Sequence, residues 1–114
     1  HGKPKDFMVI SGEDSLALSL VLAGGAGVIS VMGQALPDFS EMIRLGLDQK
    51  TGQAFDMFYQ ILPGIQLIFK EGNPAGIKAM LNHLGICEPF VRLPLIKASP
   101  ELQKKISNFV EIYK

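Results

Sequence analysis

The stretch GGAGVISVMGQ, residues Gly24–Gln34, decides how this chain folds. Its glycines precede a short, wholly apolar run, Val28–Val31, which predicts a β-strand entered through a tight turn. We expect Gly24 to end the preceding helix in a left-handed conformation, and Gly25 and Gly27 to let the backbone pass close to its neighbours. The residues that follow the run would lie at the carboxyl end of a parallel strand, where ligands bind in such sheets.

The residues before this stretch predict a first strand and a helix. Phe7–Ile10 (FMVI) is an apolar run of strand length, and Ser11–Asp14 is a loop whose acceptors can cap a helix. Ser15–Ala23 (SLALSLVLA) is apolar on nearly every helical face, so we expect it to be deeply packed. Strand, helix and strand together predict a βαβ unit with parallel strands.

This predicted sheet is incomplete. Continuous apolar strands are typical of a sheet covered on both faces, and two parallel strands do not form a stable sheet alone. No later segment of the chain has the pattern of a third strand. We therefore expect the neighbouring strands to come from elsewhere, with this chain being one part of a larger fold. The start at His1-Gly2, without Met, is typical of a processed or an artificial N-terminus, so it indicates little about the natural protein.

The remainder of the chain predicts helices. One begins at Pro37, a longer one at Thr51 with a kink at Pro63-Gly64, and a third at Asn73-Pro74, where Asn caps and Pro takes the first helical position. Gly85 ends the third, Ile86–Ala98 is an extended connector with two prolines, and Ser99-Pro100 begins the last helix. The expected buried stripes are Phe39, Met42, Ile43 and Leu47; Ala54, Phe55, Phe58, Ile61, Leu62, Ile65 and Phe69; Ile77, Met80, Leu81 and Leu84; and Leu102, Ile106, Phe109, Val110 and Tyr113.

Composition excludes several classes of function. The 114 residues carry 11 basic and 11 acidic side chains with no basic cluster, so nucleic-acid binding has no electrostatic basis. A single cysteine, Cys87, excludes an internal disulfide and favours a reducing compartment. Ser15–Leu36 is uncharged and long enough to span a membrane, but its glycines and acidic flanks favour two buried elements instead.

Few side chains suggest chemistry. The glycine cluster follows a helix and opens a strand, the reverse of a phosphate-binding loop, so we interpret it as packing. His83, Cys87 and Glu88 lack the further ligands that a zinc site needs, and no acid is placed to orient a His83–Cys87 nucleophile pair. We therefore predict no metal, no cofactor and no catalytic residue in this chain.

Three further charged positions have two interpretations each. Glu13 and Asp14, at the end of the first strand, could act on a ligand or cap the following helix, and the cap is favoured because it needs only local geometry. Arg92 could bind a carboxylate or form hydrogen bonds with helix-end carbonyls.

None of the lysines has the apolar neighbours of a Schiff-base amine; those considered are Lys50, Lys70, Lys78, Lys97, Lys104 and Lys105.

Four motifs in order resemble one family. MVISGED, LAGGAGVISV, EGNPAGIKAMLNHLG and VRLPL are similar to the C-terminal part of the dihydrodipicolinate synthases, members of the class I Schiff-base aldolase group that includes N-acetylneuraminate lyase. The resemblance covers nearly the whole chain from about Phe7. It implies an α/β fold, the C-terminal fragment of a TIM (β/α)₈ barrel. Residues 1–6 would be a leader, 7–36 strands seven and eight as the last βαβ unit, and 37–114 a mostly helical C-terminal extension.

The same resemblance implies an activity that this chain carries only in part. The family condenses pyruvate with L-aspartate-4-semialdehyde to 4-hydroxy-tetrahydrodipicolinate in lysine and diaminopimelate biosynthesis, in the cytoplasm, commonly as a homotetramer. Its Schiff-base lysine lies on strand six, outside this chain, so the isolated chain is predicted to be inactive. Ile29 matches the strand-eight position whose backbone lines the pyruvate pocket, and Gly12 matches the strand-seven glycine at the same mouth.

Departures from the family pattern limit the assignment. Glu13 stands where an aspartate is usual, and Met32–Gln34 differ from the commoner small polar residues, so no role follows for them. The alternatives are a fragment of N-acetylneuraminate lyase or another pyruvate aldolase, and, from a different class, a non-catalytic helical interaction domain that associates through exposed apolar strands.

Overall fold

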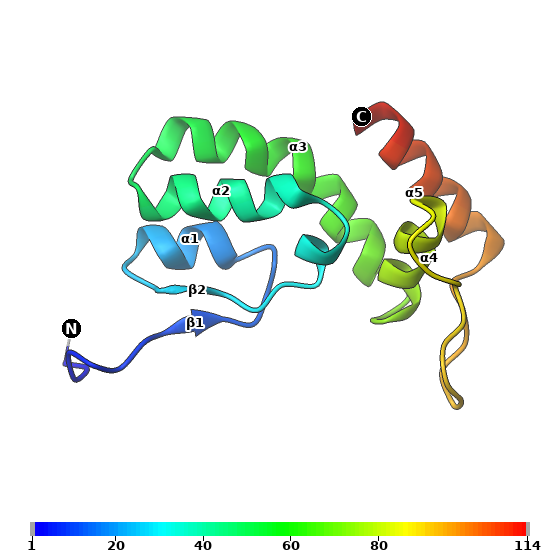
Figure 1. Ribbon diagram of the computed structural model, residues 1–114, viewed down its shortest axis with the longest axis horizontal. Helices are drawn as coiled ribbons and strands as arrows, with labels where there is room; N and C mark the ends of the chain where they lie inside the picture. The colour runs from blue at the N-terminus through cyan, green and yellow to red at the C-terminus, as the bar shows by residue number, and fades with distance from the viewer. Residues whose placement is uncertain (1, 114) are drawn as a thin grey trace.

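The two expected strands pair in parallel. A computed structural model describes residues 2–113, in which β1 (Ile10–Ser11) lies beside β2 (Gly27–Val28), with Ile10 opposite Gly27 and Ser11 opposite Val28. The helix α1 (Ala17–Leu22) connects them, which confirms the βαβ unit (Figure 1). Within residues 2–113 the sheet has these two strands only.

Both strands are shorter than the apolar runs predicted. Phe7–Val9 precede β1 without regular pairing, although the carbonyl of Val9 accepts a hydrogen bond from Ala26. The strand predicted at Val28–Val31 is too long at its C-terminal end, because Val31 already has helical backbone angles and leads into the 3₁₀ turn η1 (Met32–Gln34). An apolar run therefore marked each strand, but cross-strand pairing decided its length.

The glycine turn before β2 has the expected conformation. Gly24 has a φ of +102°, and the amides of Gly24 and Gly25 donate to the carbonyls of Val21 and Leu20, which closes α1 with a Schellman motif. A Cβ on Gly25 would lie 2.9 Å from the Leu20 carbonyl oxygen, so the close approach is confirmed there. At Gly27 a Cβ would meet nothing within 4 Å, and close packing is not the reason for that glycine.

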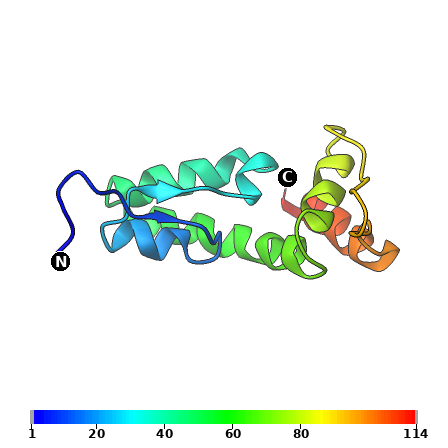
Figure 2. The same cartoon turned by 90° about the horizontal axis from the view of Figure 1, so that it is seen from below.

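Helices make up the rest of the described chain. They are α2 (Pro37–Leu47), α3 (Thr51–Phe69), α4 (Ala75–His83) and α5 (Pro100–Tyr113). In Figure 1, α1, α2 and the first half of α3 lie side by side above the strands, while α4 and α5 pack at the far end of α3. The helix α3 continues through Pro63 and changes direction in its second half, as the expected kink requires (Figure 1). Figure 2 shows the strands and the C-terminal helices at opposite ends of an elongated molecule.

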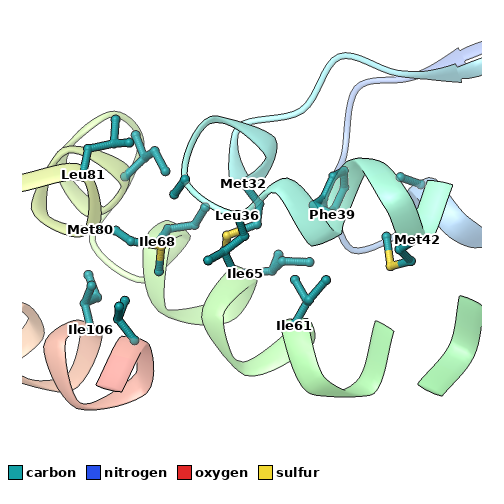
Figure 3. Close-up of a cluster of buried hydrophobic side chains, with 14 of the residues drawn as sticks. Met32, Leu36, Phe39, Met42, Ile61, Ile65, Ile68, Met80, Leu81 and Ile106 are labelled. Carbon is teal, nitrogen blue, oxygen red and sulfur yellow. The ribbon is translucent and has the colours of Figure 1, made fainter. Parts of the chain in front are cut away.

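One apolar core runs between these two ends. Met32 of η1 is fully buried against α3, where a Cβ on Gly64 would lie 3.2 Å from its methyl carbon. Figure 3 shows the side chains of α2, α3, α4 and α5 continuing the cluster in both directions; those labelled are Met32, Leu36, Phe39, Met42, Ile61, Ile65, Ile68, Met80, Leu81 and Ile106. The 3₁₀ turn after β2 is thus joined to the helical part by buried apolar contact.

Three sequence-based details were wrong. The helix α1 buries one face, with Ala17, Leu18 and Val21 inside, and leaves Leu16 61% exposed, because residues 2–113 supply neighbours on one side only. Leu47 is 43% exposed in the last turn of α2 because it faces the open space beside β2, whereas Gly46 packs against Leu18 and Val21 of α1. Pro74 precedes α4 as its N-cap and does not take the first helical position, and Asn73 provides no side-chain cap.

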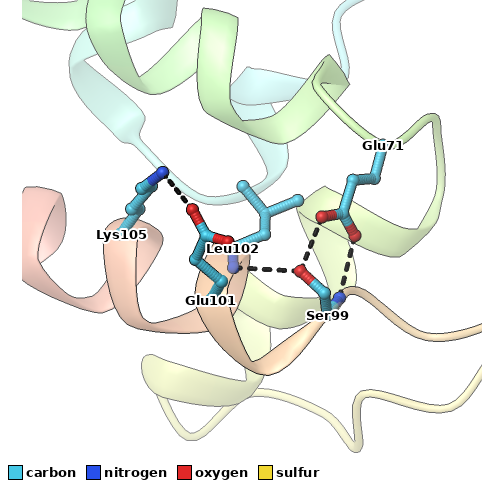
Figure 4. A network of polar contacts seen from close by, with 5 residues as sticks. All are labelled: Glu71, Ser99, Glu101, Leu102 and Lys105. Carbon is cyan, nitrogen blue, oxygen red and sulfur yellow. Dashed lines mark hydrogen bonds and ion pairs between the residues drawn. The ribbon is translucent and has the colours of Figure 1, made fainter.

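The connector between α4 and α5 is extended, as predicted, and is tied down at both ends. Gly85, at φ +75°, closes α4 with a second Schellman motif, and Lys78 Nζ donates to the carbonyl of Phe90 at 2.6 Å. At the other end Glu71 accepts hydrogen bonds from the amide and the hydroxyl of Ser99, and Ser99 Oγ accepts from the amide of Leu102 to cap α5 (Figure 4).

No helix in residues 2–113 combines the length and the apolar character needed to cross a membrane.

Candidate functional site

Gly12 and Ile29 lie together at the carboxyl end of the strand pair. Ile29 follows β2 directly and its amide donates to the carbonyl of Ser11 at 3.0 Å, one step beyond the last strand residue. Gly12 follows β1, so extending the register by one residue sets it opposite Ile29. Both residues are exposed, and the Ile29 side chain is 78% accessible. The two positions selected from the sequence therefore share one edge of the sheet.

Nothing in the described chain requires a glycine at position 12. A Cβ there would meet no atom within 4 Å, and Gly12 is not among the residues with positive φ. Packing and backbone strain, the usual reasons for a glycine, are both lacking at this position in residues 2–113. Space in front of Gly12 is instead open to anything that approaches the end of the strands.

The loop that contains Gly12 is held rigidly. Ser11 is 7% exposed, and its Oγ donates to the carbonyl of Glu13 at 2.9 Å and accepts from the amide of Glu13 at 3.1 Å. Glu13 in turn accepts hydrogen bonds from the amide and hydroxyl of Ser15 through Oε1. Glu13 therefore fixes the turn that precedes α1, but its side chain bonds no amide of the helix itself, so the expected helix cap is not seen at Glu13.

Asp14 does not cap α1, which corrects the prediction for this residue. Its side chain reaches across to the segment after β2, where Oδ2 accepts from the amides of Val31 at 3.1 Å and Met32 at 2.7 Å. Asp14 is 2% exposed, and its Oδ1 is buried with no hydrogen-bond partner among the described residues. Asp14 accepts its first hydrogen bond from Val31, 17 residues further along the chain, so no local sequence pattern predicts this contact.

A second side chain holds the same segment. The Oγ of Ser30 accepts from the amide of Gly33 at 2.9 Å, so η1 begins with three amides bonded to the side chains of Asp14 and Ser30. A helix start needs acceptors for its first amides, and both loops at this edge provide them. The sheet edge is thus a preorganised backbone surface.

Beside this edge the sheet presents bare apolar surface. Side chains on and before β1, and the one after β2, are between 38% and 78% exposed; they are Phe7, Met8, Val9, Ile10 and Ile29. An open hollow of about 510 Å³ follows the unpaired edge of β2, lined by Val28, Ser30 and residues of α2. An isolated protein rarely leaves a contiguous apolar strand surface of this kind uncovered.

The other candidate residues lie far from this edge and do not form a site. His83 ends α4 and its Nε2 lies 2.7 Å from Oε1 of Glu111 on α5, so it links two helices. Cys87 is half-buried, and residues 2–113 contain no group of three His, Cys, Asp or Glu side chains placed to bind a metal. Arg92 is exposed in the connector and makes no side-chain bond to a described residue, so neither of its proposed roles is seen.

The described lysines have no catalytic environment. All of them are exposed except the half-buried Lys78, whose amine serves the connector as given above. A Schiff-base amine needs a desolvated surrounding that lowers its affinity for a proton, and none of these side chains has one.

Comparison with known proteins places these observations in one family. The model of the dihydrodipicolinate synthetase family matches residues 2–113. The 4-hydroxy-tetrahydrodipicolinate synthase of Flavobacterium psychrophilum is 46% identical over 112 residues, which are 97% of this chain and 38% of the relative. That of Karelsulcia muelleri is 45% identical over 107 residues, or 93% of this chain and 36% of the relative.

Solved structures agree with the sequence match. The crystal structure of dihydrodipicolinate synthase from Aquifex aeolicus superposes with a TM-score of 0.91 and 35% identity, covering 96% of this chain and 38% of the other. The enzyme from Thermotoga maritima gives a TM-score of 0.91 at 33% identity, with 95% and 37% covered. The chain therefore spans less than two fifths of the length of the relatives it matches. It belongs to the dihydrodipicolinate synthetase family.

Proposed function

We propose that this chain is the C-terminal part of a 4-hydroxy-tetrahydrodipicolinate synthase, which condenses pyruvate with L-aspartate-4-semialdehyde. The observation that carries the proposal is the exposed edge of a parallel strand pair, Gly12 beside Ile29, in a chain whose relatives bear that name. The names of these relatives favour the synthase over N-acetylneuraminate lyase. The proposal assigns this chain a share of the substrate pocket and no reacting group.

In this proposal β1 and β2 are strands seven and eight of a (β/α)₈ barrel. The bare surface of Phe7, Met8, Ile10 and Ile29 supports this assignment, because each of these side chains would be covered once further strands closed the barrel. The hollow beside β2 would be filled in the same way by the elements that follow strand one. The helices from α2 onward would form the C-terminal extension outside the barrel.

Gly12 and Ile29 would line the pyruvate pocket with backbone atoms. Ligands of a parallel barrel bind at the carboxyl ends of its strands, and both residues occupy that end. The open space in front of Gly12 supports close approach of a small ligand. Their backbone groups would orient a bound carboxylate or enamine, while the amine that forms the Schiff base would come from a strand outside this chain.

The test uses the whole protein of which this chain would be a part. Purified protein would be incubated with pyruvate and L-aspartate-4-semialdehyde, and in parallel reactions with N-acetylneuraminate and with keto-sugar acids. Turnover of the semialdehyde alone supports the synthase, and a preference for a sugar acid supports another pyruvate aldolase. Borohydride reduction in the presence of pyruvate would trap the Schiff base on a lysine of the whole protein. If no substrate turns over and no adduct forms, the proposal is wrong.

The isolated 114-residue chain provides the complementary experiment. It is expected to show no condensation and no borohydride-trapped pyruvate, because no described lysine is desolvated. Gel filtration is expected to give oligomers through the open strand edges rather than a well-behaved monomer. A trapped adduct on this chain would contradict the assignment of its residues. A monomer that unfolds cooperatively would favour the helical interaction domain instead.

The whole protein is further proposed to act in the cytoplasm as a homo-oligomer, with a tetramer as the family arrangement. Size measurement of the purified whole protein tests the assembly.

A further inference from the structure

The buried carboxylate of Asp14 makes the long-range side-chain hydrogen bonds at the strand edge. It joins the loop after β1 to the segment after β2 through one oxygen that accepts two amides, at 3.1 and 2.7 Å. Burial of a carboxylate is costly unless hydrogen bonds compensate it, and bonds from amides to an ionised acceptor are stronger than neutral ones. An Asp that is 2% exposed therefore constrains the two amides tightly.

These bonds lie close to Ile29 in the chain. The amide of Ile29 is fixed on one side by the carbonyl of Ser11, and the chain is fixed again two residues later by the bond from Val31 to Asp14. The peptide groups of Ile29 and Ser30 lie between these two anchors. Their carbonyl directions are consequently set by the anchors and not by packing of the Ile29 side chain, which is exposed.

The same aspartate belongs to the rigid loop of Gly12. Ser11 Oγ bonds both the amide and the carbonyl of Glu13, so two hydrogen bonds hold the residue that precedes Asp14. Through Asp14 this loop and the Ile29 segment become one unit. A displacement of either loop would have to break a buried bond.

We propose that Asp14 is a positioning residue for the pyruvate pocket: its carboxylate holds the backbone at Ile29 in register with Gly12. The inference rests on the proposed function, because it assumes that these two backbone positions face the substrate. Asp14 does not touch the substrate in this account and acts only through the Ile29 segment.

The first test measures the anchor without using activity. In the whole protein, hydrogen exchange would be followed for the amides of Val31 and Met32, which are expected to be among the slowly exchanging ones. Asp14→Asn keeps the size and one acceptor but removes the charge, so we expect exchange in this segment to quicken about tenfold. The matched control is Asp56→Asn, which neutralises an exposed carboxylate on α3 and should leave the segment unchanged. Unprotected amides in the unsubstituted protein would overturn the proposal.

The second test separates positioning from stability by steady-state kinetics. Asp14→Asn is expected to raise KM for pyruvate about tenfold, or about 1.4 kcal/mol, with kcat and the KM for the semialdehyde each within about threefold. Asp56→Asn should match the unsubstituted enzyme. If Asp14→Asn lowers only the unfolding temperature with KM unchanged, or does not fold, the residue serves stability alone and the proposal fails.

The two failures can be told apart. A whole protein without condensation activity refutes the proposed function, while the exchange experiment still reports on the anchor. An active enzyme whose pyruvate KM does not respond to Asp14→Asn leaves the function in place and refutes the positioning role.

Discussion

Gly76 is the position at which a single methyl group should be most damaging. It is the second residue of α4 and is buried against the backbone of α3. A Cβ there would lie 2.5 Å from the carbonyl carbon of Ile68 and 2.6 Å from its Cα, and closer still to the carbonyl oxygen. Real Cβ contacts do not fall below 3.0 Å, and a helix backbone cannot rotate away as a side chain can. Because the carbonyl oxygen lies closest, Gly76→Ala must push α3 and α4 apart by about 1 Å.

The cost follows from the side chains between these helices. Ile68, Ile77 and Met80 are each 3% exposed or less, and burial of each contributes about 2 kcal/mol. A gap of about 1 Å forfeits about half of such contacts, or about 3 kcal/mol in all. The higher helix propensity of alanine offsets this loss of stability by up to about 1 kcal/mol. The free energy of unfolding of the whole protein should fall by about 2–3 kcal/mol, which lowers its urea midpoint by up to about 1 M.

Urea unfolding followed by circular dichroism measures this change, and two other glycines are controls. At Gly52, in the first turn of α3, a Cβ meets nothing within 4 Å, so Gly52→Ala should raise the midpoint. At Gly64 the Cβ would lie 2.6 Å from the Cζ of Phe109, a half-buried ring that can swing aside, so Gly64→Ala should cost less than Gly76→Ala. If Gly76→Ala is as stable as the unsubstituted protein, the backbone-clash argument is refuted.

Three further outcomes are expected. Hydrogen bonds from the Ser99 hydroxyl and amide lower the pKa of Glu71 below its ordinary 4.5, so the stability that Glu71 contributes is complete above pH 4.5 and is lost as pH falls through the lower pKa of the folded state. The urea midpoints of the unsubstituted protein and of Glu71→Gln should therefore differ near neutral pH and become equal in acid, and a difference that persists in acid would contradict this. Burial, and then the hydrogen bond to Asp38, raise the pKa of Tyr113 above its ordinary 10.0, so the stability that Tyr113 contributes is present below pH 10.0 and declines as pH rises through the pKa of the folded state. Ultraviolet titration should show one tyrosine that ionises at a higher pH than the other, and Tyr113→Phe should remove that transition. A titration curve that the substitution leaves unchanged would count against the hydrogen bond. Gln49 follows the C-cap of α2 with a φ of +59°, a conformation in which a residue with a side chain is strained. Gln49→Gly should therefore raise the free energy of unfolding by about 0.5–1 kcal/mol, and a lower stability in urea unfolding would contradict this.

Much of the local structure could be predicted because its causes are local. The apolar period of 3.6 residues predicted α2, α3, α4 and α5, since each helix bonds within its own segment. Gly24 and Gly85 predicted helix ends because a left-handed residue is needed there and few residues other than glycine adopt it. The parallel pairing followed from strand, helix and strand in succession, and the shared edge of Gly12 and Ile29 followed from that pairing.

Apart from that strand pairing, contacts between distant residues could be known only from the tertiary structure. Whether Asp14 bonds the next helix or a segment 17 residues away depends on where β2 ends, and no local pattern contains that information. Residues distant in the sequence also decided where the two strands end and why Leu16 and Leu47 are exposed. The same holds for the steric clash that a methyl group on Gly76 would make. By itself the sequence determined which segments form helices or strands and the family they resemble, because those depend on neighbouring residues in the chain. Only the folded chain decided how the two loops at the strand edge are joined, because a buried carboxylate must find its donors wherever packing brings them.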